Sequence, residues 1–416
     1  MIIGMGQVPF TSINYGLDTS TEGRMIIKAI LDATIDGLGS HETPIFPISI
    51  FKVKKGINFY PKDPNYDLYL LAIECCSKRM YPNFVNCDAS YKQQYIIPDN
   101  PDTYPATMGC RTSVIADRFG WVGLSGKGNL SPVTINLPRI GIEYGICLGK
   151  RDVPDIKGFY EELDKMLDLC IGELMDRFEY QGKQKARTTD FMMREGVWRY
   201  GETLDPDDEV RELLKHGTIS IGMVGIAECM KALFGKTHDE DPDIWNFAYN
   251  LVKYIRAYCD KMSDEKDMNV TCYATPAESC AGRFATYDKE KYGKIEGVTD
   301  RDYYTNSNHV PVYHEISAIK KIDLEAPFHA LYNAGCIAYV EVDGNARNNF
   351  MALKKFVDYA MEKDIAYFSL NLTLDRCPEC GYEGIIGDEC PVCHVKESEV
   401  HFNRIRRVNI VAPILK

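Results

Sequence analysis

Apolar residues recur along this chain at two periods, and the two periods alternate. A three- and four-residue spacing predicts a helix over residues 22–38, carried by Ile27, Ile30, Leu31, Ile35 and Leu38. The same period predicts further helices over about 65–78, 155–180, 243–262 and 347–363. Short apolar runs predict strands, which cover 45–53, 84–86, 268–273, 336–342 and 365–370. This alternation favours a mixed α/β body with a parallel sheet or barrel.

Three polar segments interrupt the pattern. Residues 88–109 form a long loop rich in Asp, Pro and Tyr, and loops of this length are usually functional. The run 205–209 predicts a helix start, with Asp205 as N-cap and Pro206 at the first helical position. Residues 304–311 lead into a predicted strand, and there His309 is interpreted as a structural histidine rather than a catalyst.

Composition narrows the function classes. The 416 residues allow two or three domains, or one large α/β barrel with an appendage. The net charge of −12, with a single basic cluster at residues 404–407, argues against nucleic acid as a ligand. No apolar run approaches the ~18 residues of a membrane span, and the first residues do not resemble a signal peptide. Fifteen cysteines, an odd count, fit a reducing cytoplasm better than a disulfide framework.

Four cysteines near the end give the most specific local signal. Cys377, Cys380, Cys390 and Cys393 form a C-x2-C-x9-C-x2-C pattern. Two such knuckles direct four thiolates toward one point, which suits the tetrahedral preference of Zn²⁺. We therefore predict a structural zinc ribbon, with a redox dithiol or an iron–sulfur cluster as the alternatives. His394, which follows the last cysteine, is expected to be exposed to solvent.

A second candidate thiol ends the long loop. Cys110 lies between Gly109, which allows close backbone approach, and Arg111, whose cation favours a lowered thiol pKa. From spacing alone, a space-filling cysteine is the favoured interpretation. The glycine-bracketed turn that follows, residues 126–130, feeds a strand and presents the amide of Asn129 to a pocket.

A polar loop follows the predicted strand 268–273. Its candidate ligand-binding residues are Thr275, Ala277 and Glu278. Loops at the carboxyl end of a strand that lead into a helix N-terminus bind anions such as phosphate. We expect an N-capped helix start here in any case, and a phosphate-binding role is an even alternative, with Arg283 one turn further on.

Six ordered motifs together resemble the anaerobic (class III) ribonucleoside-triphosphate reductases, which are glycyl-radical enzymes. The motifs are residues 8–16, 108–111, 128–130 with 136–139, 274–278 with 282–284, 304–307 with 309–312, and the cysteine quartet. The resemblance extends over the whole chain except about its last ten residues.

The resemblance implies a ten-stranded α/β barrel of two five-stranded parallel halves, here incomplete at its N-terminus. It also implies that Cys110 forms a thiyl radical that removes the 3′ hydrogen of a ribonucleoside triphosphate, after which the 2′ hydroxyl leaves as water. By the same resemblance Asn129 faces the substrate hydroxyls, formate is the reductant, and the quartet is the family's zinc site. The expected partners are a radical-SAM activating enzyme with a [4Fe–4S] cluster and a second copy of the chain.

Two departures from the family pattern stand out. The family has a nucleotide-binding regulatory region and the first part of the barrel upstream of residue 1, and Ile410 stands where the family's radical-storing glycine belongs. A split gene whose partner chains supply both ends is the favoured explanation, ahead of a truncated pseudo-enzyme. The expected division is therefore a catalytic barrel portion at 1–374, a zinc ribbon at 375–396 and a divergent tail at 397–416. Two alternatives remain: another glycyl-radical enzyme, and a zinc-ribbon interaction protein without activity.

Overall fold

The computed structural model describes residues 11–39, 43–44, 46–109, 111–113, 117–342, 349–372, 375–377, 379–384, 386 and 389–396, with the backbone alone at 278, 372, 375–376 and 383–384. These residues form two compact units. The first comprises Met1–Ala89, Ile316–Asp323 and Ile337–Lys416, and the second comprises Ser90–Glu315 and Leu324–Cys336. Within the described residues, no helix is both long and apolar enough to cross a membrane.

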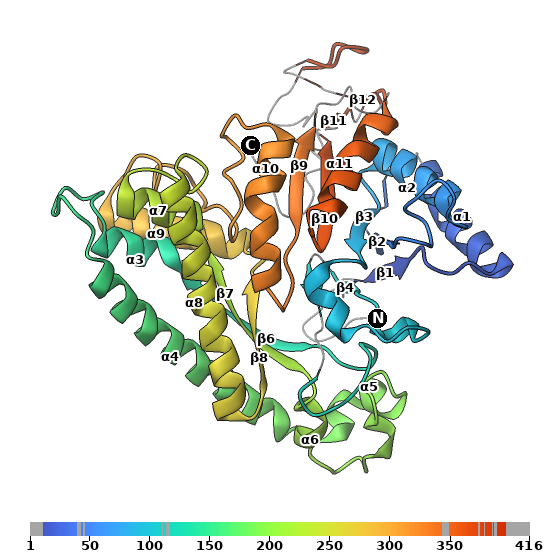
Figure 1. Cartoon of the computed structure of the whole chain (residues 1–416), viewed down its shortest axis with the longest axis horizontal. Helices are drawn as coiled ribbons and strands as arrows, with labels where there is room; N and C mark the ends of the chain where they lie inside the picture. The colour runs from blue at the N-terminus through green and yellow to red at the C-terminus, as the bar shows by residue number, and fades with distance from the viewer. Residues whose placement is uncertain are drawn as a thin grey trace. The chain divides into compact units, whose positions relative to one another are not determined.

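The first unit is built on a five-stranded sheet with the order β1-β2-β3-β10-β9 (Figure 1). Its strands are β1 (Ser12–Tyr15), β2 (Ile48–Val53), β3 (Asn83–Asn86), β9 (Ala338–Val342) and β10 (Tyr367–Leu372). The first three are parallel, β10 runs antiparallel to β3, and β9 is parallel to β10. Its helices are α1 (Thr21–Asp36), α2 (Tyr66–Arg79) and α11 (Phe350–Glu362), and α2 packs against both others.

Two short strands near the chain end, β11 (Asp375–Arg376) and β12 (Glu383–Gly384), pair antiparallel in the cysteine-rich segment. Helix α10 (Ala318–Glu325) and the 3-10 helix η5 (Ala326–Leu331) follow each other directly in the chain.

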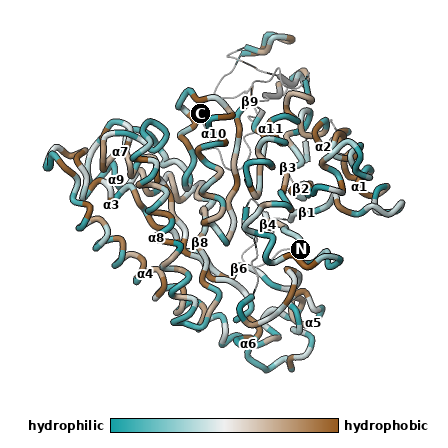
Figure 2. The backbone as a smooth tube through the Cα atoms, in the orientation of Figure 1, coloured by the Kyte–Doolittle hydropathy of each residue, from teal (hydrophilic) through white to brown (hydrophobic). Residues whose placement is uncertain are grey.

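The second unit is built on a parallel sheet with the order β6-β7-β8. The strands are β6 (Asn129–Asn136), β7 (Thr218–Val224) and β8 (Asn269–Ala274). The long helices α4 (Ile156–Gly182) and α8 (Pro242–Lys266) pack against β6 and β8, and both alternate between hydrophobic and hydrophilic stretches in Figure 2. Their apolar faces meet the strands in one core that includes Leu163, Leu167, Ile221, Leu251 and Ile255. This core packs against the sheet that carries the candidate site.

Shorter elements complete the second unit. Its remaining α-helices are α3 (Leu137–Tyr144), α5 (Asp190–Arg194), α6 (Arg211–Leu214), α7 (Ile226–Phe234) and α9 (Glu278–Tyr292). Its other 3-10 helices and short strands are η1 (Ser90–Tyr95), η2 (Pro101–Thr103), η3 (Ala186–Thr189), η4 (Gly201–Thr203), β4 (Thr107–Met108) and β5 (Thr112–Ser113).

The predicted long helices and the strands around them are confirmed, but two local predictions are wrong. Residues 205–208 form a turn rather than a helix start, because the N–H of Asp208 donates to the carbonyl of Asp205 (2.9 Å) and the helix that follows, α6, has only four residues. Residues 304–311 lead into turns and then α10, not into a strand. The α/β class is thus established, and closure into a ten-stranded barrel stays a prediction.

Candidate functional site

A small hairpin carries the segment around the predicted reactive thiol. Strands β4 and β5 pair antiparallel, Thr107 with Ser113 and Met108 with Thr112, so that residues 109–111 connect them. Gly109 has φ 55°, a left-handed conformation that favours glycine. Cys110 itself lies outside the described residues, and its catalytic role stays a prediction.

The hairpin is fixed to the carboxyl end of β8. Arg111 is fully buried, and its Nη1 donates to the carbonyl of Ala274 at 3.3 Å. The hydroxyls of Thr112 and Tyr273 lie 2.6 Å apart, and the N–H of Ser113 donates to the carbonyl of Ala334 at 2.8 Å. The three residues that directly follow Cys110 in the chain are therefore anchored.

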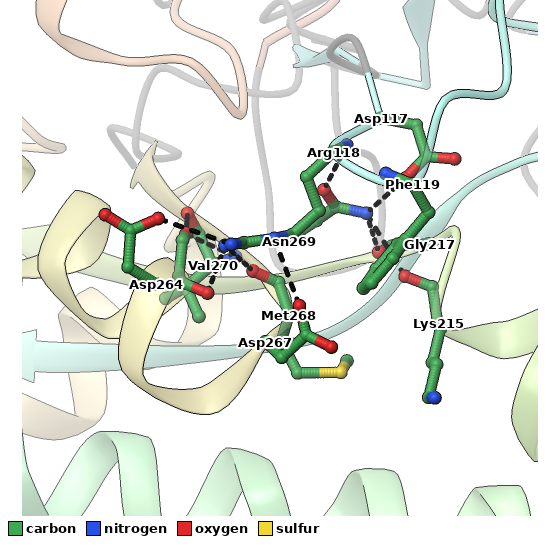
Figure 3. Close-up of polar contacts among 11 residues, drawn as sticks. Asp117, Arg118, Phe119, Lys215, Gly217, Asp264, Asp267, Met268, Asn269 and Val270 are labelled. Atoms are coloured by element: carbon green, nitrogen blue, oxygen red, sulfur yellow. Dashed lines mark hydrogen bonds and ion pairs between the residues drawn. The ribbon is translucent and has the colours of Figure 1, made fainter.

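The loop that leads away from the hairpin is fixed at a second point, shown in Figure 3. Asn269, the first residue of β8, donates from Nδ2 to Asp117 Oδ1 at 3.0 Å and accepts at Oδ1 from the N–H of Arg118 at 3.1 Å. Burial alone would raise the pKa of Asp117, but hydrogen bonds from His216, Asn269 and the N–H of Phe119 outweigh it, and the pKa is lowered. We call Asp117, Arg118 and Asn269 the clasp.

Asn129 begins a polar row across the three parallel strands. Its Nδ2 donates to Ser220 Oγ, and the Ser220 hydroxyl lies 2.7 Å from that of Thr271. The Asn129 side-chain oxygen Oδ1 is buried and has no hydrogen-bond partner in the described chain. An unpaired acceptor of this kind suits a ligand hydroxyl.

The predicted anion loop follows β8 directly. Thr275 accepts from the hydroxyl of Thr134 at 3.1 Å, and the hydroxyl of Ser307 donates to its carbonyl at 3.4 Å. Helix α9 begins at Glu278 with the buried Ala277 as N-cap, which supplies no side-chain capping bond. The predicted helix start is thus confirmed, whereas the expected side-chain cap is absent because alanine has no acceptor. The backbone N–H groups of the first turn of α9 are the feature that suits an anion.

The structure brings some predicted residues together and leaves others out. Thr275 is joined to Thr134 of β6 and Asn129 lies on the same sheet, whereas Arg283 is exposed. His309 is buried, with its Nδ1 3.1 Å from Glu325 Oε2, as expected of a structural histidine.

Sequence reasoning missed a carboxylate that forms hydrogen bonds to two of the motifs, residues 136–139 and 304–307. Asp288 is fully buried and accepts from Arg139 Nε at 2.6 Å, from Asn136 Nδ2 at 2.8 Å and from the Tyr304 hydroxyl at 2.9 Å. It lies inside helix α9, where nothing in its local sequence marks it. This network holds α9 against the end of β6.

A pocket of about 90 Å³ lies in the second unit beside strand β5, whose Ser113 lines it. It is lined by aromatic and basic residues that include Tyr91, Lys92, Arg256 and Tyr332. Asn129, Thr275 and Ala277 do not line it, so it is not the predicted substrate site.

The cysteine quartet converges as its spacing predicts. The four Sγ atoms of Cys377, Cys380, Cys390 and Cys393 all lie within 4.8 Å of one another. The Cys377–Cys393 and Cys380–Cys390 sulfur distances are 3.5 and 3.7 Å. Tetrahedral coordination with metal–sulfur bonds of about 2.3 Å requires sulfur separations of about 3.8 Å. The residues present therefore fit a tetrahedral metal ion.

The backbone supports this geometry. In both knuckles a backbone N–H closes the turn, from Gly381 to the Cys377 carbonyl and from His394 to the Cys390 carbonyl, each at 3.0 Å. His394 is exposed and pairs through Nδ1 with Glu389 at 2.9 Å, which confirms that it is not part of the sulfur cluster.

The family model of the anaerobic ribonucleoside-triphosphate reductases matches residues 1–409. The chain belongs to this family. It is 36% identical over 398 residues to the anaerobic ribonucleoside-triphosphate reductase of Haemophilus influenzae, covering 93% of this chain and 54% of that protein. With the enzyme of the same name from phage T4 it shares 36% over 412 residues, covering 97% of this chain and 64% of the relative. The chain thus spans about half to two thirds of the length of these relatives.

Solved structures agree on the fold. The anaerobic ribonucleotide reductase of Thermotoga maritima with glycerol in the active site superposes with a TM-score of 0.59 at 17% identity, covering 94% of this chain and 60% of that one. The B12-independent glycerol dehydratase of Clostridium butyricum gives 0.55 at 11% identity, covering 86% and 50%. These similarities establish the fold and leave the choice of substrate to the family membership.

Proposed function

We propose that this chain is the catalytic portion of an anaerobic ribonucleotide reductase that converts ribonucleoside triphosphates to deoxyribonucleoside triphosphates. The observation that carries the proposal is the attachment of the β4–β5 hairpin, which contains Cys110, to the carboxyl end of β8, where the loop Thr275–Glu278 begins. This attachment links the candidate hydrogen abstractor to the candidate phosphate-binding loop.

In this proposal the Cys110 sulfur removes the 3′ hydrogen of the ribose and later returns a hydrogen. Overall, the C–O bond to the 2′ hydroxyl breaks and a C–H bond forms in its place. One formate and one proton are consumed, and one carbon dioxide and one water are released. Formate is oxidised by two electrons and the ribose is reduced by two. Water must be kept from such a radical, and the dense core beside the sheet supports this requirement.

Asn129 and the anion loop orient the substrate. The unpaired, buried Oδ1 of Asn129 accepts a hydrogen bond from a ribose hydroxyl, because Nδ2 is already committed to Ser220. The phosphates lie at the start of α9, where Thr275, Ala277 and the backbone of Glu278 precede the free N–H groups of the first turn.

The cysteine quartet holds one Zn²⁺, and its role is structural. Four sulfur ligands complete a tetrahedral ion and leave no position for substrate or water. The segment 375–396 is too short to bury a core of its own, so the metal supplies the folding energy of this ribbon. The proposed partners are a radical-SAM activating enzyme and a second copy of the chain. The proposed tail, residues 397–416, lies outside the described residues.

The test is anaerobic co-expression with a radical-SAM activating enzyme. The segments that the relatives carry beyond the matched region, including a tail with the Gly-Tyr sequence, are supplied as separate polypeptides. We expect a glycyl doublet in electron paramagnetic resonance and formate-dependent deoxynucleotide formation. Cys110→Ala should abolish product while the doublet remains, whereas Cys147→Ser, at a half-buried thiol outside the site, should retain both. Product formation by the Cys110→Ala variant would refute the assignment.

A further inference from the structure

Arg111 is the largest fully buried side chain in the described part of the chain, and most of its hydrogen-bonding capacity is unused. Nη1 donates to the carbonyl of Ala274 at 3.3 Å. Nε and Nη2, in contrast, are buried and have no hydrogen-bond partner in the described residues. A guanidinium stays charged in proteins, and burying it without a partner is costly. This arrangement suits an anionic ligand.

No side chain in the described part of the chain accepts a hydrogen bond from Nε or Nη2. Glu325, whose charge raises the pKa of the neighbouring His329 while the charge of Arg111 lowers it, accepts from Val310 N–H at 3.0 Å and lies 3.1 Å from His309 Nδ1. Burial lowers the pKa of His329 to about 3, so His329 is neutral at physiological pH and carries no negative charge. No carboxylate among the described residues is therefore bonded to the Nε–Nη2 edge of Arg111.

The unpaired atoms lie on one edge of the guanidinium. Nε–H and Nη2–H point in parallel and match the two oxygens of a carboxylate, which they bind as a fork. Nη1 on the other edge is fixed to Ala274, so the fork is held in one orientation. A lysine, with a single point charge, does not reproduce this geometry.

We infer that the Nε–Nη2 edge of Arg111 is the binding site for the carboxylate of formate. This inference rests on the proposed function, which requires formate as reductant. Arg111 follows Cys110 in the chain and is bonded to the residue before Thr275, so formate bound here lies at the junction of the thiol hairpin and the substrate loop. Oxidation of formate yields neutral carbon dioxide, which the guanidinium does not retain.

Formate binding is measured on the full chain without turnover, by saturation transfer from protein to the formate proton. The wild type should show saturable transfer, which acetate displaces poorly because of its methyl group. Arg111→Lys should weaken formate binding about tenfold and Arg111→Gln should abolish it. Arg177→Gln is the matched control, because Arg177 is paired with Glu173 and with the carbonyl of Pro132 at the surface of α4 and should leave binding unchanged.

A second measurement does not depend on the variants folding. In the wild type, formate should slow amide hydrogen exchange in the peptide that covers residues 107–113, and chloride at equal ionic strength should not. Absence of both the saturation transfer and the slowed exchange would overturn the site.

The two proposals fail separately. Formate binding that requires Arg111, in a protein that makes no deoxynucleotide under the co-expression test, refutes the proposed function and keeps the site. Deoxynucleotide formation with an unchanged KM for formate in Arg111→Lys refutes the site and keeps the proposed function.

Discussion

Replacing Asn269 with alanine tests whether the clasp holds the loop after the thiol hairpin. Asn269 is 3% exposed, and its Nδ2 group serves three acceptors: Asp117 Oδ1 at 3.0 Å, and the carbonyls of Lys215 and Gly217 at 3.1 and 3.2 Å. Its Oδ1 accepts from the N–H of Arg118 at 3.1 Å. Alanine removes two N–H donors and one acceptor at once.

The expected cost follows from these bonds. Two of these bonds, to Asp117 and from Arg118, reach the loop, so at about 1 kcal/mol each its local opening free energy falls by roughly 2 kcal/mol. One factor of ten corresponds to about 1.4 kcal/mol, so amide exchange in residues 117–121 should accelerate by about 30-fold. Hydrogen-exchange mass spectrometry of that peptide measures the effect directly.

The control is Asn250→Ala, on the exposed face of α8, where a change within about 0.5 kcal/mol is expected. If the amide hydrogen-exchange rate in residues 117–121 of the Asn269→Ala variant equals that of the control, the role of the clasp is refuted. Acceleration spread evenly over the whole second unit would also refute it, because it would mean that Asn269 stabilises the sheet rather than the loop.

Three further outcomes are expected. The purified protein should carry one zinc per chain by elemental analysis, and Cys380→Ser should lose most of it while helical circular dichroism remains. Gly335→Ala should lower the free energy of unfolding in urea by at least about 2 kcal/mol, because Gly335 has φ +117° and the new Cβ would lie 2.0 Å from the Arg111 carbonyl oxygen. The control Gly149→Ala, at φ +64° with open space around the new Cβ, should lower it by only about 1 kcal/mol. Burial raises the pKa of Glu228, so the wild-type unfolding free energy should fall as pH rises above the ordinary value of about 4.5, and Glu228→Gln should flatten that slope in urea titrations.

Features set by local spacing could be predicted from the sequence. Helices α4 and α8 were predicted because their apolar stripes extend over many turns, and Asp155 and Asp241 cap them through side-chain bonds to Gly158 and Asp243. The cysteine quartet was predicted for the same reason, since both knuckles lie within one short segment.

Features that depend on distant residues could not be predicted. Strand β7 was missed although apolar residues alternate with Thr, Ser and Gly along Thr218–Val224, because the run is short and Gly is unfavourable in a strand interior. The hydrogen bonds of Asp288 and Asn269 were missed because each joins residues that lie far apart in the sequence. Arg139 and Asp288 are 149 positions apart, and Asp117 and Asn269 are 152 positions apart. Neither residue differs in its neighbourhood from an ordinary surface or strand residue.

Strand β8 contacts both the thiol hairpin and the clasp. Its first residue, Asn269, binds Asp117, and its last residue, Ala274, accepts from Arg111, so the chain between 111 and 117 is fixed at the two ends of the same strand. A shift of β8 along its axis therefore moves both Arg111 of the hairpin and the loop that begins at Thr275, because both are attached to the carboxyl end of the same strand.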